Sequence, residues 1–157
     1  MLKKIAIANL LAPRKTLKSL TSCLFLVVVA LIVLMENTNA EIATVNIAQR
    51  QAEAWETGNV SAIVADFAPE GVFIAGNFVF KGTAAIKKAA EDYFQEFADT
   101  KVEIKRIILE ESQGAIEWNW SDRNIATNQI SKAEDAIIFE LKNDGKIVYW
   151  REYIEKK

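Results

Sequence analysis

The sequence predicts an α+β fold with helices on one face of a curved sheet. Two observations lead to this fold class. Apolar residues recur at helical spacing in three stretches between residues 45 and 97, with only short strand-like runs among them. From Lys101 onward they alternate with charged and polar residues, which is typical of strands with one buried face. Because helices precede the long strands instead of alternating with them, the order favours α+β over a parallel α/β sheet.

Residues 1–40 are predicted to be an export signal outside the fold. Basic residues come first, namely Lys3, Lys4, Arg14, Lys15 and Lys18. An uncharged apolar stretch follows over residues 19–35, and then the small residues Thr38-Asn39-Ala40. This order is typical of a secretory signal peptide, so we expect cleavage after Ala40 and a periplasmic or secreted domain over residues 41–157. The alternative is an uncleaved anchor at residues 19–35, in which case the chain contacts the membrane only through that segment.

Two helices are predicted to open the exported domain. The first has apolar positions at Val45, Ala48, Ala52 and Trp55. Gly58 ends it in a left-handed conformation. Asn59 then caps a second, short helix with apolar positions at Val60, Ile63, Val64 and Phe67. Pro69 prevents that helix from continuing.

Two short strands and a third helix come next. Residues 71–75 and 78–80 are predicted to be buried strands. Thr83 is then expected to cap the third helix. The apolar side of this helix comprises Ile86, Ala90, Tyr93, Phe94 and Phe97.

Four antiparallel strands complete the domain. The first begins at Lys101, and the second carries the alternating residues Ile116, Trp118 and Trp120. Residues 136–142 and 146–154 form a hairpin across a turn at residues 143–145, whose Asp-Gly pair is a strong turn signal. The polar stretch 121–131 is predicted to be a long hairpin loop.

Composition excludes several classes of function. The chain has no His, which rules out imidazole catalysis and His-ligated metals, and its one Cys lies in the apolar run before residue 40. We therefore expect no metal and no cofactor. Residues 1–40 hold five of the 19 basic residues and one of the 21 acidic residues, so residues 41–157 carry a net charge of −6. An acidic domain is a poor match for nucleic acid.

Four sequence segments, in this order along the chain, resemble the nuclear transport factor 2-like superfamily, and within it the SnoaL-like polyketide cyclase group. They are residues 54–59, 80–86, 116–120 and 144–154. The resemblance implies a cone-shaped curved antiparallel sheet with three helices packed on one face. It implies little about activity, because this fold serves isomerases, dehydratases, cyclases, hydrolases and binding modules.

Glu152 is the leading candidate for chemistry. Alternation places it on the same strand face as Trp150, and the resemblance implies that this face lines the cone. A carboxyl among apolar neighbours keeps its proton more readily and can act as a general acid or base. The alternative is a salt bridge to Arg106 or Arg151 that only holds the sheet together.

Five other residues are weaker candidates. Tyr93 is a second catalytic candidate, able to donate to a developing oxyanion, but its helical spacing also fits packing with the hydroxyl at the rim. Trp118 and Trp120, like Trp150, could stack on a flat ligand, although aromatic stripes usually form core. Asp66 could face the pocket mouth or could be an ordinary solvated carboxylate.

Two functional hypotheses remain open. One is an exported module that binds a small, flat, apolar or aromatic molecule. The other is a cofactor-free isomerase or cyclase-type enzyme that uses Glu152 as general acid or base. Two ionisable groups converging in the pocket would favour the enzyme, whereas an isolated carboxyl would favour binding. Relatives that hydrolyse limonene epoxide use an Arg and an Asp two residues apart, where this chain has Glu117-Trp118-Asn119-Trp120.

A homodimer is also expected. Tyr149, Arg151 and Tyr153 share the strand face opposite to Glu152 and form a broad aromatic surface. Relatives of this fold commonly associate through that face.

Overall fold

The computed structural model describes residues 25, 27–32, 35 and 47–157. The chain divides into two units, Met1–Glu36 and Asn37–Lys157. The described residues before position 36 are helical and exposed. None of the described helices is both long enough and apolar enough to cross a membrane. The predicted cleavage after Ala40 and the helix start at Val45 lie outside the described residues, as does most of the predicted anchor.

Two helices meet at Gly58, as predicted. The first is described over residues 47–56, and Gly58 follows with φ +65°. Asn59 caps α2 (Val60–Ala65) by accepting a hydrogen bond from the Ala62 N–H. The predicted extension of α2 to Phe67 is wrong, because Phe67 begins β1 (Phe67–Ala75) and pairs with Ile147. Its helical spacing was coincidental, since a buried strand residue also needs an apolar side chain.

The third helix, α3 (Thr83–Glu96), follows β2 (Phe78–Lys81). The predicted cap at Thr83 is wrong by one residue. Gly82 is the N-cap, with φ +81° and no side-chain hydrogen bond. The turn from β2 into α3 needs a left-handed residue, and glycine adopts that conformation without strain. Phe97, predicted on the helix, instead begins β3.

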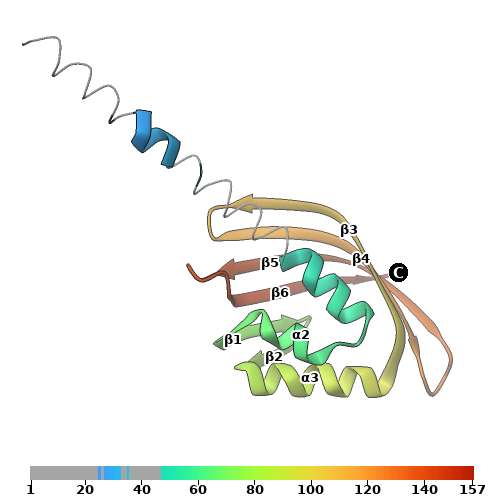
Figure 1. Ribbon diagram of the computed structural model, residues 1–157. Coiled ribbons are helices and arrows are strands. Elements are labelled where there is room, and N and C mark those ends of the chain that lie inside the picture. The colour runs from blue at the N-terminus through green and yellow to red at the C-terminus, as the bar shows by residue number, and fades with distance from the viewer. Residues whose placement is uncertain (1–24, 26, 33–34, 36–46) are drawn as a thin grey trace, which may run out of the picture. The chain divides into compact units, whose positions relative to one another are not determined.

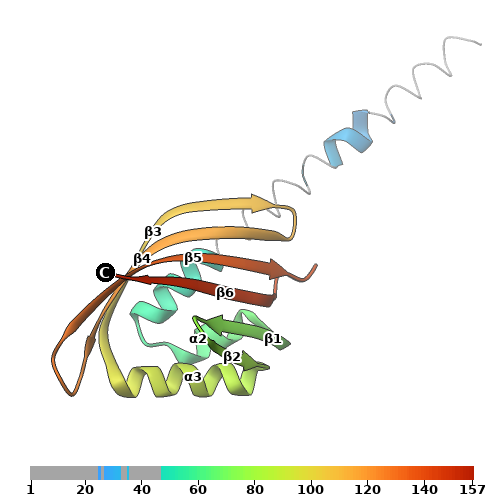
Figure 2. The same ribbon diagram turned by 180° about the vertical axis from the view of Figure 1, so that it is seen from behind.

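The six strands form one sheet in the order β2-β1-β6-β5-β4-β3. The four long strands are β3 (Phe97–Glu110), β4 (Gln113–Asn124), β5 (Ile130–Leu141) and β6 (Ile147–Lys156). Neighbours are antiparallel except for the parallel pair β1–β6. Figures 1 and 2 show the sheet curved, with the helices on one face. The predicted α+β class is confirmed.

The predicted long loop at 121–131 is wrong. β4 runs through Asn124 and β5 begins at Ile130, so only residues 125–129 connect them. The stretch is polar because its inward residues bond to one another: the Ser131 hydroxyl donates to Asp122 on the paired strand. The turn at residues 143–145 is confirmed, with Gly145 at φ +78°.

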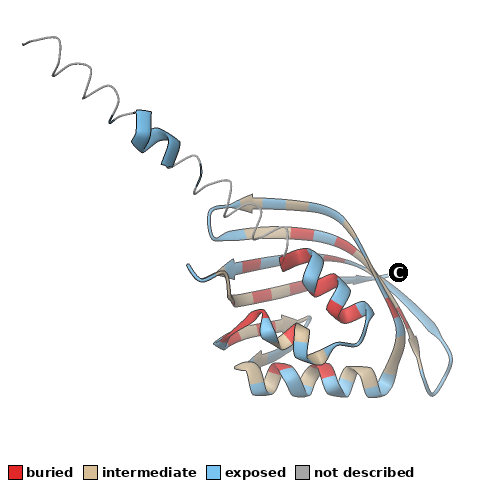
Figure 3. Cartoon of the chain, viewed as in Figure 1, coloured by how far each residue is buried: buried red, intermediate tan, exposed pale blue. Residues whose placement is uncertain are grey.

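Side chains on the inner face of the sheet form the core, together with the helices. Buried positions alternate along β5, and on β6 they are Ile147, Trp150 and Glu152; Figure 3 shows them beneath the helices. One register row crosses all six strands through Phe80, Phe73, Trp150, Phe139, Gly114 and Leu109. Gly114 leaves room for the rings in this row, because a Cβ there would lie 2.7 Å from Phe139 Cζ and 2.5 Å from the Ile108 carbonyl oxygen.

Candidate functional site: a pair of buried carboxyls

Three tryptophans of the inner face each donate their indole N–H to a carboxylate. Trp150 donates to Glu152 at 2.9 Å, Trp118 to Asp135 at 3.0 Å and Trp120 to Asp122 at 3.0 Å. The rings contact one another, since the Trp118 centroid lies 6.0 Å from that of Trp120 and 5.8 Å from that of Trp150. The sheet therefore carries three acidic side chains on its apolar face.

Glu152 is buried without a positive partner. Its side chain accepts the Trp150 indole N–H, and no ion pair reaches it among the described residues. Burial raises the pKa of Glu152 to about 8, the indole hydrogen bond lowers it, and the charge of Asp135 raises it. Glu152 therefore holds its proton at neutral pH. The salt bridges predicted from Glu152 to Arg106 or Arg151 are not formed. Arg106 Nε instead lies 3.8 Å from Glu117 Oε2, and the Arg151 guanidinium stacks over the Tyr153 ring.

Asp135 is the second carboxyl of the site. It is only 5% exposed, its Oδ2 accepts the Trp118 indole N–H, and its Oδ1 is buried without a hydrogen-bond partner. Burial raises the pKa of this side chain. Sequence reasoning missed Asp135, although a signal was present. It precedes Ile137 and Phe139 at alternate positions, so the rule that placed Glu152 inward also places Asp135 inward.

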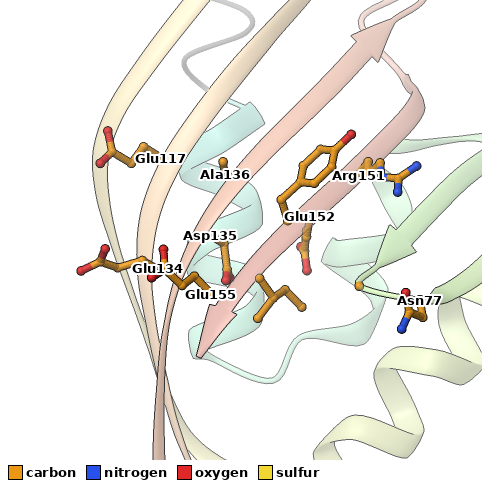
Figure 4. Close-up of a pocket in the computed structure, with 11 residues that line it drawn as sticks. Asn77, Glu117, Glu134, Asp135, Ala136, Arg151, Glu152 and Glu155 are labelled. Carbon is orange, nitrogen blue, oxygen red and sulfur yellow. The ribbon is translucent and has the colours of Figure 1, made fainter. Parts of the chain in front are cut away.

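The two carboxyls are diagonal neighbours on adjacent strands. Glu152 is in register with Ile137, and Asp135 with Ile154. Diagonal neighbours in a sheet lie about 7–8 Å apart, close enough for an electrostatic effect in a buried setting. Figure 4 shows both side chains extending in the same direction from β5 and β6.

An accessible apolar edge adjoins Glu152 on the inner face. Glu152 is in register with Ala75, which pairs in turn with Phe78. Phe78 is 70% exposed, and Ile154, two positions beyond Glu152 on the same face, is 40% exposed. Glu152 itself is 9% exposed. The carboxyl thus lies where the packed core gives way to apolar side chains that solvent can reach.

Asp122 belongs to a different and fully bonded network. It accepts hydrogen bonds from the Trp120 indole, from Ser131 and, at 2.9 Å, from the Tyr93 hydroxyl. The Tyr93 oxygen also lies 3.0 Å from Thr100 Oγ1, and burial raises the pKa of Tyr93. Tyr93 therefore donates its proton to Asp122 and is not placed beside Glu152.

The remaining predicted site residues lie in two other places. Trp118 and Trp150 are fully buried, and Trp120 is half-buried. Asp66, immediately after α2, accepts hydrogen bonds from Arg50 at 2.8 Å and from Gln51 at 3.2 Å. It holds the first helix against α2, and it has no contact with Glu152.

A cleft of about 590 Å³ runs along β5 and β6. Its walls include Glu117, Glu134, Ala136, Arg151 and Tyr153, which alternation places on the outer face (Figure 4). Asp135, Glu152 and Ile154 of the inner face also border it, whereas Trp118 and Ile137 do not. The cleft therefore lies mainly against outer-face residues and also borders the two buried carboxyls.

A second cleft, of about 490 Å³, lies farther along the sheet. Its walls come from β3, β4 and β5 and include Trp120, Lys101 and Glu103. Among the described residues, no group of three or more Cys, Asp or Glu side chains is placed to hold a metal ion.

Solved structures show where this fold belongs. One similar structure is a protein with a ketosteroid isomerase-like fold from Catenulispora acidiphila, solved with trimethylamine (16% identity, 68% of this chain and 83% of that one, TM-score 0.64). A second is a candidate SnoaL-like polyketide cyclase from Jannaschia sp. CCS1 (13% identity, 73% and 86% covered, TM-score 0.65). At these identities the likeness shows the fold, which is nuclear transport factor 2-like.

A third similar structure is the epoxide hydrolase/cyclase-like enzyme SalBIII of pyran ring formation in salinomycin (19% identity, 73% and 92% covered, TM-score 0.64). The family follows from a sequence match, since the model of the SnoaL-like domain matches residues 48–150. The chain belongs to the SnoaL-like domain family, which includes polyketide cyclases and isomerases. No curated protein matches it.

Proposed function

We propose that this SnoaL-like domain binds a small, neutral, largely apolar molecule at the inner-face edge and transfers a proton to and from it through Glu152. One observation carries the proposal. Glu152 is a buried carboxyl with an indole as its hydrogen-bond donor and a second carboxyl beside it, and none of the ion pairs among the described residues involves it. Structural carboxylates are usually neutralised or fully hydrogen-bonded, as Asp122 and Asp66 are here.

Two converging ionisable groups favour an enzyme over a passive binding module. An isolated carboxyl would suffice to orient a ligand, but Asp135 adds a second acidic group on the same face. Pairs of carboxyls whose environments disfavour ionisation are typical of sites that move protons. The similar structures include a candidate SnoaL-like polyketide cyclase and a ketosteroid isomerase-like protein, and both names agree with a reaction that moves protons. This agreement is at the level of fold alone.

The protonation of Glu152 sets the order of steps. With a pKa of about 8, the side chain is an acid at neutral pH. It donates its proton to a substrate carbonyl oxygen and takes a proton from the carbon α to that carbonyl, which leaves a dienol. It then gives this second proton to the γ carbon, while the enol oxygen returns the first proton to Glu152. Trp150 holds one carboxyl oxygen through its N–H, which leaves the other oxygen for the substrate. A β,γ-unsaturated ketone meets these requirements, because its isomerisation moves one proton between two carbons.

The proposal predicts isomerisation of a simple probe, β,γ-cyclohexenone, to the conjugated ketone. Absorbance of the conjugated product measures the rate, and deuterium incorporation from D₂O reports the proton transfer. Glu152→Gln should lower the protein-dependent rate about 10²–10⁴-fold, the usual contribution of a general acid or base. Glu117→Gln is the matched control, because Glu117 is an exposed outer-face carboxyl bordering the cleft. A wild-type rate no faster than buffer, or an unchanged rate in Glu152→Gln, would contradict the proposal.

Association and export are part of the same proposal. The outer face carries a second register row, from Ile108 through Ala115, Ile138, Arg151 and Ile74 to Val79. Ile108, Ile138 and Val79 are exposed, which supports a homodimer through this face. Light scattering at micromolar concentration should give twice the monomer mass, whereas Ile138→Lys should give a monomer.

Intact-mass analysis of exported protein should show a chain beginning at Glu41.

A further inference from the structure

We propose that Asp135 is a positioning residue for this chemistry: an acidic neighbour on the adjacent strand that keeps the proton on Glu152 until a substrate takes it. The inference rests on the proposed function of Glu152 and adds a residue that acts on Glu152 through space. Asp135 is not proposed to touch the substrate.

The position of Asp135 is fixed from two directions. Trp118 of β4 is in register with Asp135 of β5 and donates its indole N–H to Asp135 Oδ2 at 3.0 Å. Trp118 is itself immobilised by full burial and by ring contacts with Trp120 and Trp150. Because the Trp150 ring that contacts Trp118 also donates to Glu152, the two tryptophan–carboxyl pairs form one packed unit.

Nothing in the described structure neutralises Asp135. Its Oδ1 is buried without a hydrogen-bond partner, and no ion pair involves this side chain. A charge in such a place is poorly screened, so its field reaches a diagonal neighbour with little loss. The charge of Asp135 is accordingly one of the influences that favour protonated Glu152.

The other acidic side chains of the inner face are bonded to partners of their own, and the charged neighbours of Glu152 on β6 lie on the opposite face. Asp122 is held by Tyr93, Trp120 and Ser131, and Asp66 by Arg50. On β6, Arg151 and Glu155 alternate to the outer face, and the register partners of Glu152 are Ala75 and Ile137. Asp135 is therefore the charged side chain that can act on Glu152 from the inner face.

This arrangement has a consequence for the reaction cycle. When Glu152 donates its proton, two carboxylates occupy diagonal positions on adjacent strands, and no ion pair of the described residues reaches either of them. The repulsion favours return of a proton to Glu152, which completes a transfer between two positions of the substrate. Without Asp135, Glu152 would ionise at lower pH and would be a weaker proton acceptor afterwards.

The indole N–H signals provide a test that does not depend on activity. The chain has four tryptophans, so ¹⁵N-tryptophan labelling gives a simple spectrum, with Trp150→Phe assigning the Trp150 signal. In a pH titration the Trp150 signal reports the charge of Glu152. Asp135→Asn should lower its midpoint by about one pH unit, since a like charge is removed while an acceptor for Trp118 remains. Asp135→Glu, which restores the charge, should return the midpoint toward the wild-type value.

Asp122→Asn is the matched control. Asp122 also accepts an indole N–H on the inner face, so the substitution disturbs the sheet without removing the charge beside Glu152. It should leave the Trp150 midpoint unchanged. An unmoved midpoint in Asp135→Asn, or an equal shift in Asp122→Asn, would overturn the role of Asp135 even if the ketone is isomerised. A shift confined to Asp135→Asn in a protein without isomerase activity would support the coupling and reject the proposed function.

Discussion

Glutamine in place of Glu152 should stabilise the protein at pH 9, by on the order of 4 kcal/mol in the free energy of unfolding. Burial raises the pKa of Glu152 from 4.5 to about 8, and each unit corresponds to about 1.36 kcal/mol. The amide is neutral at every pH, is of similar shape and still accepts the Trp150 indole N–H. It therefore removes the penalty of burying a carboxylate while keeping the hydrogen bond.

The pH dependence of this difference in unfolding free energy follows from proton linkage. Between pH 4.5 and about 8 the folded protein keeps the Glu152 proton and the unfolded chain loses it, so raising the pH favours unfolding. The contribution of the protonated side chain is complete below pH 4.5 and is lost as the pH passes through 8. Wild type and variant should thus be equally stable near pH 4 and diverge above it.

Urea unfolding at several pH values measures this difference. Glu117→Gln, at an exposed outer-face carboxyl, should follow the wild-type curve. A Glu152→Gln protein less stable than wild type at pH 9 would show that the carboxylate holds the sheet together, which is the salt-bridge interpretation.

Alanine in place of Asp122 should have the opposite effect, a loss of roughly 3–5 kcal/mol at neutral pH. Asp122 accepts hydrogen bonds from Tyr93, Trp120 and Ser131, and removing it leaves these donors without their acceptor. A hydrogen bond to a charged group contributes about 1.5–3 kcal/mol, and unpaired buried donors add their desolvation penalty.

Thermal and urea unfolding check this expectation. Tyr93→Phe removes one of the donors and should cost about 1–2 kcal/mol. Near wild-type stability in Asp122→Ala would mean that the network is not formed. Asp122 and Glu152, which both accept an indole N–H, would then not differ in stability effect in the way that their other hydrogen-bond partners indicate.

Local patterns were sufficient to predict much of this fold. The helices, the junction at Gly58, the order of the elements along the chain and the turn before Gly145 all follow from periodicity and turn chemistry. Errors came where a residue satisfied two patterns at once. Phe67 fitted a helix and a strand equally well, and the polar stretch 121–131 resembled a loop because its hydrogen-bond partners lie on the neighbouring strand.

The site was only half predictable for a related reason. The inward position of Glu152 follows from alternation within one strand. The pairing of Glu152 with Asp135 depends on the register between β5 and β6, which no local pattern specifies. The role of Tyr93 likewise depends on Asp122, which is far away in sequence but close in space.

The chemistry proposed for Glu152 requires that this side chain keep its proton at neutral pH. A pH titration of the Trp150 indole signal in the wild-type protein, with Glu152→Gln as reference, measures this protonation. We expect a single transition near pH 8 that is absent from the glutamine variant. A transition near pH 4.5, or one that persists without Glu152, would show that the carboxyl is an ordinary ionised side chain and would contradict its proposed role.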